Sequence, residues 1–514
     1  MITFLIALLA LFVGYVVYGR FVEKVFAPDE RQTPAQSSAD GVDFIPMKTW
    51  KATLIQLLNI AGLGPIFGAL AGACFGPIVL LWIVFGAILG GAVHDYMSGM
   101  ISGRHQGESL AGLSGRYLGK PGLYGMRVFS VVLLVLVGVT FTAAPAGLLA
   151  KLSSDSFGLP QLTTNFWIVV VLCYYVMATL LPIDKIIGRL YPLFGVLLTV
   201  MALGIMVAVL FTPEVQIEMA KNPGLAQLLC QGQEACTIQL KLPEMQLANL
   251  HPKGDAVWPF MFIVVACGAI SGFHATQSPM MAKCMVGERE GRKIFYGAMI
   301  LEAGIALIWA VAGTAFYGGT ENLGALVQAA GKPAVAVYDI STTLLGVVGG
   351  AMAVIGVIVC PITSGDTAFR TVRLILAEWA GVEQKTFSKR LVITVPLMVV
   401  GAALTQINFD ILWRYFSWAN QTLAMMALWV ATVYLMRHEK YRFSSLITAL
   451  PATFMTAVTV TYIMLVKIGF NLPPSIAYPV GILIAVACFA WYLVTALKTR
   501  STGAPAPEAA TQNA

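Results

Sequence analysis

Several ionisable side chains lie inside long apolar stretches of this sequence, among them His94, Asp95, His274 and Glu302. Charge is costly in such surroundings, so these residues are candidates for a function by default. His274 titrates near neutral pH when unperturbed, which suits a proton carrier or a switchable ligand. The plainer alternative is a neutral ring satisfied by a backbone carbonyl. Glu302 can likewise hold a proton or pair with a polar neighbour.

His94 and Asp95 are neighbours in the sequence. Adjacent residues do not share a helix face, so the sequence does not predict a preformed pair. We interpret them as a gate near the cytoplasmic end of a helix. The alternative is that they mark a solvated helix end.

A second group of polar residues follows Pro361 and comprises Thr363, Ser364 and Asp366. Proline frees a carbonyl in a helix, and hydroxyl and carbonyl oxygens at such a break can coordinate a cation. This pattern keeps sodium open as a coupling ion beside the proton. Arg414 lies in another apolar run, either as a counter-ion for a carboxylate or extending its side chain to the nearby outer surface.

Two apolar runs are interrupted by small residues, one in each half of the chain. The first interruption reads Asn59-Ile-Ala-Gly-Leu-Gly-Pro65 and the second reads Gly268-Ala-Ile-Ser-Gly-Phe-His274. Broken helices at matching places in two halves indicate a transporter binding site, whereas ordinary packing of small residues is the alternative. The predicted substrate-binding residues are Asn59, Gly62, Gly64, Pro65, Ser271, Gly272, Phe273 and His274.

The cysteines and known sequence motifs limit the chemistry. Cys230 and Cys236 fall in a long loop outside the apolar runs, where an oxidising compartment permits a disulfide; two free thiols are the alternative. There is no phosphate-binding lysine loop, and the spacing of histidine and cysteine fits no zinc site. We therefore expect no enzyme activity, no metal and no cofactor other than a coupling ion, with the proton favoured over sodium.

The composition is that of a membrane protein. Hydrophobic residues make up 58% of the 514 residues, charged residues only 11%, and the mean hydropathy is +0.80. Soluble domains carry about 25% charged residues, so this chain is expected to have lipid as its surroundings. The net charge of +7 comes from short basic clusters between apolar runs, which excludes nucleic acid as a partner. A small-molecule substrate is expected, and no obligate protein partner.

About thirteen apolar runs are long enough to span a bilayer. Most of the lysines and arginines fall in alternate loops when the N-terminus is outside, as the positive-inside rule requires. We therefore predict a multi-pass protein of the inner (cytoplasmic) membrane with its C-terminus in the cytoplasm. The runs are 2–19, 52–72, 76–101, 124–148, 164–182, 190–212, 257–277, 294–317, 340–360, 391–407, 411–436, 444–466 and 477–497.

A short pattern occurs twice along the chain. Glu108-Ser-Leu-Ala-Gly-Leu leads to a Gly-Lys-Pro that ends at Pro121, and Glu321-Asn-Leu-Gly-Ala-Leu leads to one that ends at Pro333. The predicted topology places the two copies on opposite faces, as an inverted repeat of five helices would. The expected divisions are an N-terminal helix and linker (1–50), a first repeat (51–212), an extracytoplasmic loop (213–256), a second repeat (257–436), two C-terminal helices (437–500) and a disordered tail (501–514).

Several of these stretches resemble the carbon starvation protein A (CstA) family. The resemblance is carried by Asp43-Phe-Ile-Pro, Ile60-Ala-Gly-Leu-Gly-Pro, Gly91-Ala-Val-His-Asp, Ala266-Cys-Gly-Ala-Ile-Ser-Gly-Phe-His and Gly365-Asp-Thr-Ala-Phe-Arg, and it runs to about residue 500. The sequence departs from longer members at Ile55 and Gln56, where they have two histidines, and after His274.

The resemblance implies an all-α, polytopic transporter of the leucine-transporter type, with a 5+5 inverted repeat, one extra N-terminal helix and two extra C-terminal helices. It also implies proton-coupled import of pyruvate in carbon starvation. A peptide or amino-acid importer, with coupling to sodium still open, is the alternative within this fold. A membrane receptor is a third reading, opposed by the lack of a cytoplasmic signalling domain.

Overall fold

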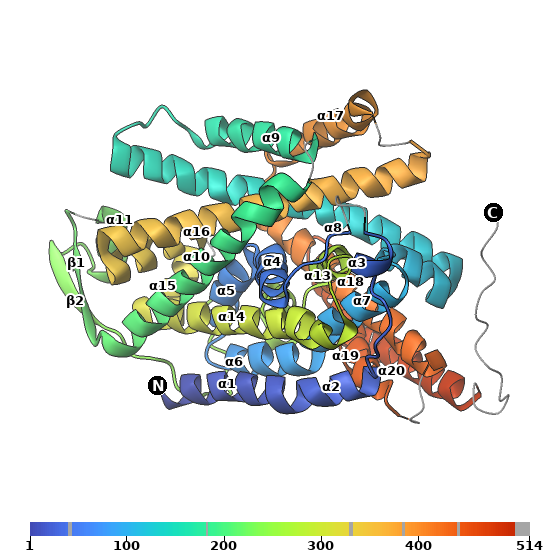
Figure 1. Cartoon of the computed structure of the whole chain (residues 1–514). Helices are drawn as coiled ribbons and strands as arrows, with labels where there is room; N and C mark the ends of the chain where they lie inside the picture. The colour runs from blue at the N-terminus through green and yellow to red at the C-terminus, as the bar shows by residue number, and fades with distance from the viewer. Residues whose placement is uncertain are drawn as a thin grey trace.

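The computed structural model describes residues 1–39, 44–180, 183–220, 222–327, 333–382, 386–438 and 443–498. The chain forms a bundle of long helices, and the described part contains one two-stranded hairpin (Figure 1) and an isolated bridge between Met47 and Met285. The tail 501–514, expected to be disordered, lies outside the described residues.

The first half of the bundle follows an N-terminal rod. The rod comprises α1 (Ile2–Val13), η1 (Gly14–Tyr18) and α2 (Gly19–Phe26), and a short α3 (Pro34–Ser37) lies in the linker after it. The next helices are α4 (Thr49–Ala61), η2 (Gly64–Gly68), α5 (Ala69–Ala73), α6 (Val79–Leu81), η3 (Trp82–Gly91), α7 (Ala92–Arg104), α8 (Leu110–Phe157), α9 (Thr164–Leu180) and α10 (Ile183–Phe211).

The second half begins after the loop that carries the hairpin. It comprises η4 (Val257–Met261), α12 (Phe262–Val264), α13 (Gly272–Ala282), η5 (Glu288–Glu290), η6 (Arg292–Tyr296), α14 (Gly297–Phe316), α15 (Thr320–Val327), α16 (Pro333–Ala380), α17 (Phe387–Leu404) and α18 (Phe409–His438). Two more helices, α19 (Leu446–Leu465) and α20 (Pro474–Lys498), pack against each other at the C-terminal side of the bundle (Figure 1).

Many of these helices are suited to lipid. Within the described residues, nine are long and apolar enough to cross a membrane, and a tenth is obtained when the bent pair Thr49–Ala61 and Gly64–Ala73 is counted as one span. The protein is therefore polytopic, and the count of thirteen spans stays a prediction. Helices α8 and α16 pack against each other in the bundle, while α9 and α17 lie together at its edge (Figure 1).

The two halves have matching irregularities. The bent pair of the first half turns by 58° between α4 and η2, and in the second half the chain is not helical between α12 and α13. Helices α8 and α16 are kinked at Gly119 (φ 75°, ψ −171°) and at Gly346 (φ 65°, ψ −166°). Such a backbone conformation strongly favours glycine.

The short sequence repeat does not mark these kinks in both halves. The first Gly-Lys-Pro contains the kink at Gly119, but the second ends at Pro333, where α16 begins, and the kink of α16 lies further on at Gly346. The two copies of the short pattern therefore stand at different distances along the chain from the kinks of α8 and α16. Local similarity of loops does not fix where each following helix bends.

The two breaks meet in the centre of the bundle. A Cβ atom on Gly64 would overlap the side chain of Cys267, and a Cβ atom on Gly272 would overlap the Asn420 carbonyl oxygen and the Ala424 nitrogen of α18. Glycine at these positions lets three backbones approach closely, as small residues do in membrane proteins. The two breaks are therefore packed against each other and against α18.

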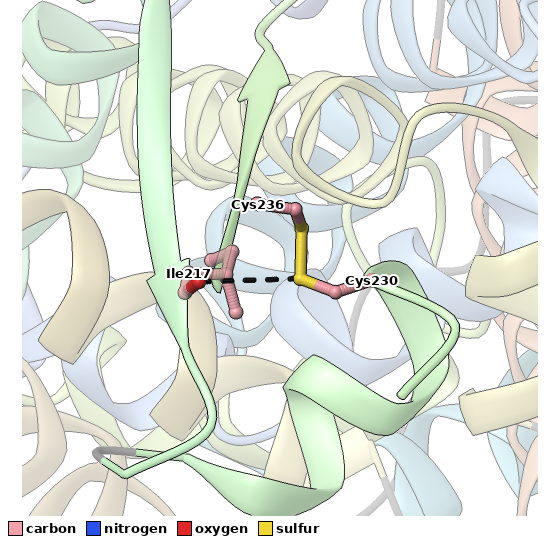
Figure 2. Close-up of a disulfide and its surroundings, with 3 residues drawn as sticks. All are labelled: Ile217, Cys230 and Cys236. Atoms are coloured by element: carbon pink, nitrogen blue, oxygen red, sulfur yellow. Dashed lines mark hydrogen bonds between the residues drawn. A yellow bond between two sulfur atoms is a disulfide. The ribbon is translucent and has the colours of Figure 1, made fainter. Parts of the chain in front are cut away.

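The loop 213–256 is folded and holds a disulfide. Strands β1 (Glu214–Glu218) and β2 (Ala235–Gln239) pair antiparallel with Ile217 opposite Cys236, and α11 (Pro223–Leu229) connects them. A disulfide joins Cys230, directly after α11, to Cys236 on β2 (Figure 2). The sequence left a disulfide and two free thiols open as alternatives, and the structure has the disulfide.

The same loop caps the first helix. The Glu244 carboxylate accepts hydrogen bonds from the backbone nitrogens of Ile2 (3.1 Å) and Thr3 (3.0 Å) and from the Thr3 hydroxyl (2.6 Å). The amino terminus and Thr3 lower the pKa of Glu244 to about 2. A carboxylate at a helix N-terminus is favoured by the helix dipole. The chain start and the disulfide loop therefore lie at the same end of the bundle.

We predict that a membrane-impermeant maleimide labels Cys230 and Cys236 in spheroplasts only after mild reduction, because the disulfide removes both thiols. A variant with both cysteines replaced by serine is the control and should show no gain of label on reduction. Gain of label at these positions before reduction would contradict the disulfide. No gain after reduction would contradict an outer location of the loop.

We further predict that Gly64→Ala and Gly272→Ala each lower the melting temperature of the purified protein in detergent. The added methyl group has no room, and such overpacking typically costs about 1–3 kcal/mol. The matched control is Gly304→Ala in α14, where a Cβ atom would meet nothing within 4 Å. Equal melting temperatures for all three variants would refute the close packing of the breaks.

Candidate functional site

Asp95 links two histidines in the interior of the bundle. Its Oδ1 lies 2.8 Å from Nδ1 of His94, and its Oδ2 lies 2.8 Å from Nδ1 of His274. All three side chains are buried. The expectation that His94 and Asp95 do not form a pair is therefore wrong. A carboxylate has two acceptor oxygens, so one can bond the neighbouring side chain while the other reaches across to the second break.

Glu302 and Cys267 complete this cluster from two further elements. The Glu302 Oε2 of α14 lies 3.4 Å from Nε2 of His274. The sulfur of Cys267, in the unwound segment before α13, lies within 4.8 Å of the ligand atoms of both. The expectation of no metal rested on sequence spacing, but the fold brings together three residues that can hold a metal ion. We define Cys267, His274, Glu302, Asp95 and His94 as the central cluster.

The second break is held in place by two adjacent amides of α18. The Asn420 Oδ1 accepts a hydrogen bond from the backbone nitrogen of Phe273 (2.7 Å), and its Nδ2 donates to the Ala266 carbonyl. The Gln421 Nε2 donates to the carbonyls of Phe262 and Val265, each at 3.1 Å. Unwound backbone in an apolar region must find such partners. These two residues therefore define the shape of the break.

Sequence reasoning missed Asn420, Gln421 and Cys267. Two adjacent amide side chains inside the apolar run 411–436 were a usable signal, because polar groups there need partners. Cys267 lay inside a stretch singled out for its glycines and its histidine. Nothing in the sequence alone indicated that its sulfur would face Glu302.

The first break contacts α16 through backbone carbonyls at the C-terminal end of α4. The Ser364 hydroxyl donates to the Leu58 carbonyl (3.4 Å), and the Cys360 thiol points at the Gly62 carbonyl (3.6 Å). The Thr363 hydroxyl donates to the Cys360 carbonyl (2.8 Å). Helix α16 runs through Pro361 without the break expected from sequence, so the contact of this segment with α4 is made by the Ser364 hydroxyl and the Leu58 carbonyl.

Three of the residues singled out in the sequence, Asp366, Arg414 and Asn59, make no hydrogen bond to the central cluster among the described contacts. The Oδ1 of Asp366 lies 3.7 Å from the guanidinium nitrogen Nη2 of Arg370, one turn further along α16. The same nitrogen donates a hydrogen bond to the Ala178 carbonyl of α9. Arg414 is exposed near the start of α18, which agrees with a side chain that extends to the surface. Asn59 is buried in α4, and its Oδ1 makes no hydrogen bond among the described residues.

Aromatic side chains fill the region beside the two breaks. Phe141 of α8 packs edge-on against Phe273 and Phe416. A Cβ atom on Gly62 would overlap the Phe141 ring. A cavity of about 730 Å³ lies elsewhere, between the N-terminal rod, η3 and α19, and is lined by apolar residues such as Trp82 and Phe454. The side chains of the central cluster are themselves buried.

The end of the bundle opposite the disulfide loop is tied by Arg104. Its guanidinium donates to both Glu288 oxygens (2.9 Å each), to the Ala27 carbonyl (2.9 Å) and to the Tyr434 hydroxyl (3.1 Å). It also stacks over the ring of Phe26. This network joins α2, α7, η5 and α18, so Arg104 and Glu288 close this end, whereas His94 and Asp95 lie further inside.

Comparison with known proteins places the chain in one family. The sequence model described as Carbon starvation protein CstA matches residues 1–159, 151–311 and 357–462. A Haemophilus influenzae protein described as an uncharacterized membrane protein is 42% identical over 64% of this chain and 94% of its own length. A Helicobacter pylori protein named Peptide transporter CstA is 26% identical over 87% of this chain and 79% of its own.

Two further comparisons bear on activity and fold. The Pyruvate/proton symporter BtsT of Escherichia coli is 27% identical over 58% of this chain and 47% of its own length. The crystal structure of MhsT in complex with L-phenylalanine superposes over 88% of this chain and 99% of its own with a TM-score of 0.52 at 16% identity. That likeness shows a leucine-transporter-type fold. With the family model matched across most of its length, this chain is a membrane transporter of the CstA family.

Proposed function

We propose that this protein is a secondary active transporter that imports a short carboxylate, pyruvate first among them, across the cytoplasmic membrane together with protons. The observation that carries the proposal is the meeting of two broken helices at a buried polar centre, with Gly64 against Cys267. Backbone and side-chain polar groups converge there, in a region that is otherwise apolar. Such a centre can replace the water around a small anion.

Contacts at one end of the bundle and beside the breaks support transport by alternating access. Arg104 and Glu288 tie that end, and the ring of Phe141 packs edge-on against that of Phe273 in the second break. A transporter must open to each side in turn, and discrete contacts of this kind can break and re-form. The proposed role as an importer in carbon starvation is supported by the description of the family model, Carbon starvation protein CstA.

The proton is proposed as the coupling ion because the relative from Escherichia coli is named a pyruvate/proton symporter. Sodium is the alternative, supported by the Ser364 hydroxyl and the Leu58 carbonyl, which meet between α16 and α4, and by the hydroxyl of the neighbouring Thr363. Orientation with the N-terminus outside and the C-terminus in the cytoplasm is also proposed. It rests on the distribution of basic residues and on the shared position of Glu244 and the chain start.

Peptides or amino acids are the second candidate substrates. Several relatives carry the name Peptide transporter CstA, and the solved structure of similar fold holds L-phenylalanine. All these substrates contain a carboxylate, so they share one requirement at the site. They differ from pyruvate in carrying an amino group and more volume.

We predict that proteoliposomes with the purified protein accumulate labelled pyruvate under an inward proton gradient. A labelled dipeptide and labelled phenylalanine are tested in parallel, and their unlabelled forms serve as competitors of pyruvate. Excess unlabelled pyruvate should abolish the uptake, whereas the peptide and the amino acid should leave it unchanged. Accumulation of the peptide without pyruvate would replace the substrate assignment. Tight binding without uptake of any of them would favour a receptor.

We also predict that accumulation depends on the proton and not on sodium. A pyruvate anion that enters with one proton carries no net charge, so the pH gradient drives its uptake, and one pH unit supplies about 1.4 kcal/mol, which corresponds to roughly ten-fold accumulation. A protonophore should abolish the accumulation in sodium-free buffer. The comparison variant is Ser364→Ala, which removes a hydroxyl from the possible sodium position. Accumulation that requires sodium and is lost in this variant would contradict proton coupling.

A further inference from the structure

We propose that Cys267, His274 and Glu302 form a binding site for a divalent transition-metal ion such as zinc. One sulfur, one imidazole nitrogen and one carboxylate oxygen lie within 4.8 Å of one another, and all three residues are buried. The Nε2 of His274 and Oε2 of Glu302 are 3.4 Å apart. Thiolate, imidazole and carboxylate are the ligand types that zinc takes in proteins. The ligands come from the unwound segment, α13 and α14.

The surroundings of His274 favour Nε2 as a ligand atom. Its Nδ1 lies 2.8 Å from Asp95 Oδ2, so Nδ1 can donate its proton to the carboxylate and leave the Nε2 lone pair free. Histidines that bind metals usually donate their other ring nitrogen in this way, which fixes the tautomer and raises ligand basicity. Asp95 is in turn fixed by His94 at 2.8 Å.

The sulfur of Cys267 also has suitable neighbours. It lies 3.2 Å from the Ser271 hydroxyl and 3.9 Å from the Asn420 amide nitrogen. In the structure the thiol donates to the Ser271 hydroxyl, which in turn donates to Asn420 Oδ1, so the Asn420 amide nitrogen is the group placed to donate to a thiolate. Because the thiolate binds the metal, occupation of the site releases the thiol proton to solvent. The amide that holds the second break thus also supports a metal ligand.

Several polar atoms of the cluster lack hydrogen bonds. Among the described residues, the Nε2 of His274 and both carboxylate oxygens of Glu302 make none of ordinary geometry, although both side chains are buried. Nε2 of His274 and Oε2 of Glu302 approach each other to 3.4 Å, but burying polar atoms without hydrogen bonds of good geometry lowers the stability of the fold. A cation bound between these atoms would satisfy them and balance the charge of the carboxylates.

The location of the site would let the ion bind the substrate, an inference that rests on the proposed transport function. Three protein ligands leave a fourth position open on a tetrahedral ion. Cys267 touches Gly64 of the first break, so the ion would lie beside the predicted substrate region, where the open position can accept a substrate carboxylate. An Nε2 bound to metal cannot carry a proton, so this assignment excludes His274 as the coupling residue.

The test uses the purified full-length protein in detergent, stripped with a chelator and titrated with Co²⁺. We expect one ion to bind per chain and to produce the near-ultraviolet charge-transfer band of a cobalt–thiolate bond. Zinc should displace the cobalt, abolish the band and raise the melting temperature. Since all ligands are buried, each step is followed over hours.

Variants assign the ligands. Cys267→Ser should lose the band, and Glu302→Gln should bind cobalt at least 10-fold more weakly. Asp95→Asn should lower the affinity about 10- to 100-fold, as loss of a supporting carboxylate does. The matched control is Cys360→Ser, because Cys360 is also buried and faces the first break; it should keep both the band and the affinity.

Two results would overturn the site: no saturable cobalt binding by the wild-type protein, or an unchanged band in Cys267→Ser. The wild-type result is decisive even where a variant fails to fold. Metal binding is measured without substrate, and transport is measured separately as uptake into proteoliposomes. A failure of the proposed transport function therefore does not count against the metal site. Pyruvate uptake that is unchanged after full removal of metal would overturn the use of the open position by substrate.

Discussion

The attachment of the second break to α18 is the interaction on which the centre of this protein depends. Backbone without helical hydrogen bonds is tolerated at membrane depth only where other groups replace those bonds. Asn420 and Gln421 do so for Ala266, Phe273, Phe262 and Val265. The amide pair therefore decides where the chain leaves α12 and where α13 begins.

The central cluster is a consequence of that unwinding. Cys267 precedes α13, His274 lies in its first turn, and the open backbone between them lets both side chains face Glu302 of α14. Asp95 then approaches from α7 and fixes the ring of His274. Four separate elements thus supply one polar centre, so movement of any of them changes its geometry. This coupling of position to chemistry is what alternating access requires.

Close backbone contacts hold the two breaks together. Glycines 64 and 272 leave no room for even a methyl group, and Ser364 and Cys360 of α16 contact the carbonyls at the end of α4. Tightly packed interfaces have discrete arrangements and do not deform continuously. At one end of the bundle, the contact between helices is polar and is made by Arg104 and Glu288. Such an ion pair can break completely when that end opens and form again when it closes.

The sequence by itself determined that the protein lies in a membrane, that it is helical and that two of its helices are broken, because hydropathy, glycine and proline act locally along the chain. It also determined the family and the ionisable residues that would be buried. It also indicated the disulfide between Cys230 and Cys236. Only the tertiary structure decided that His94 contacts Asp95, that α16 bends at Gly346 rather than near Pro361, and that Cys267 and Asn420 belong to the centre. The reason is physical: a sequence pattern reports how one helix meets its surroundings, while contacts between elements depend on how each helix is rotated and crossed by its neighbours.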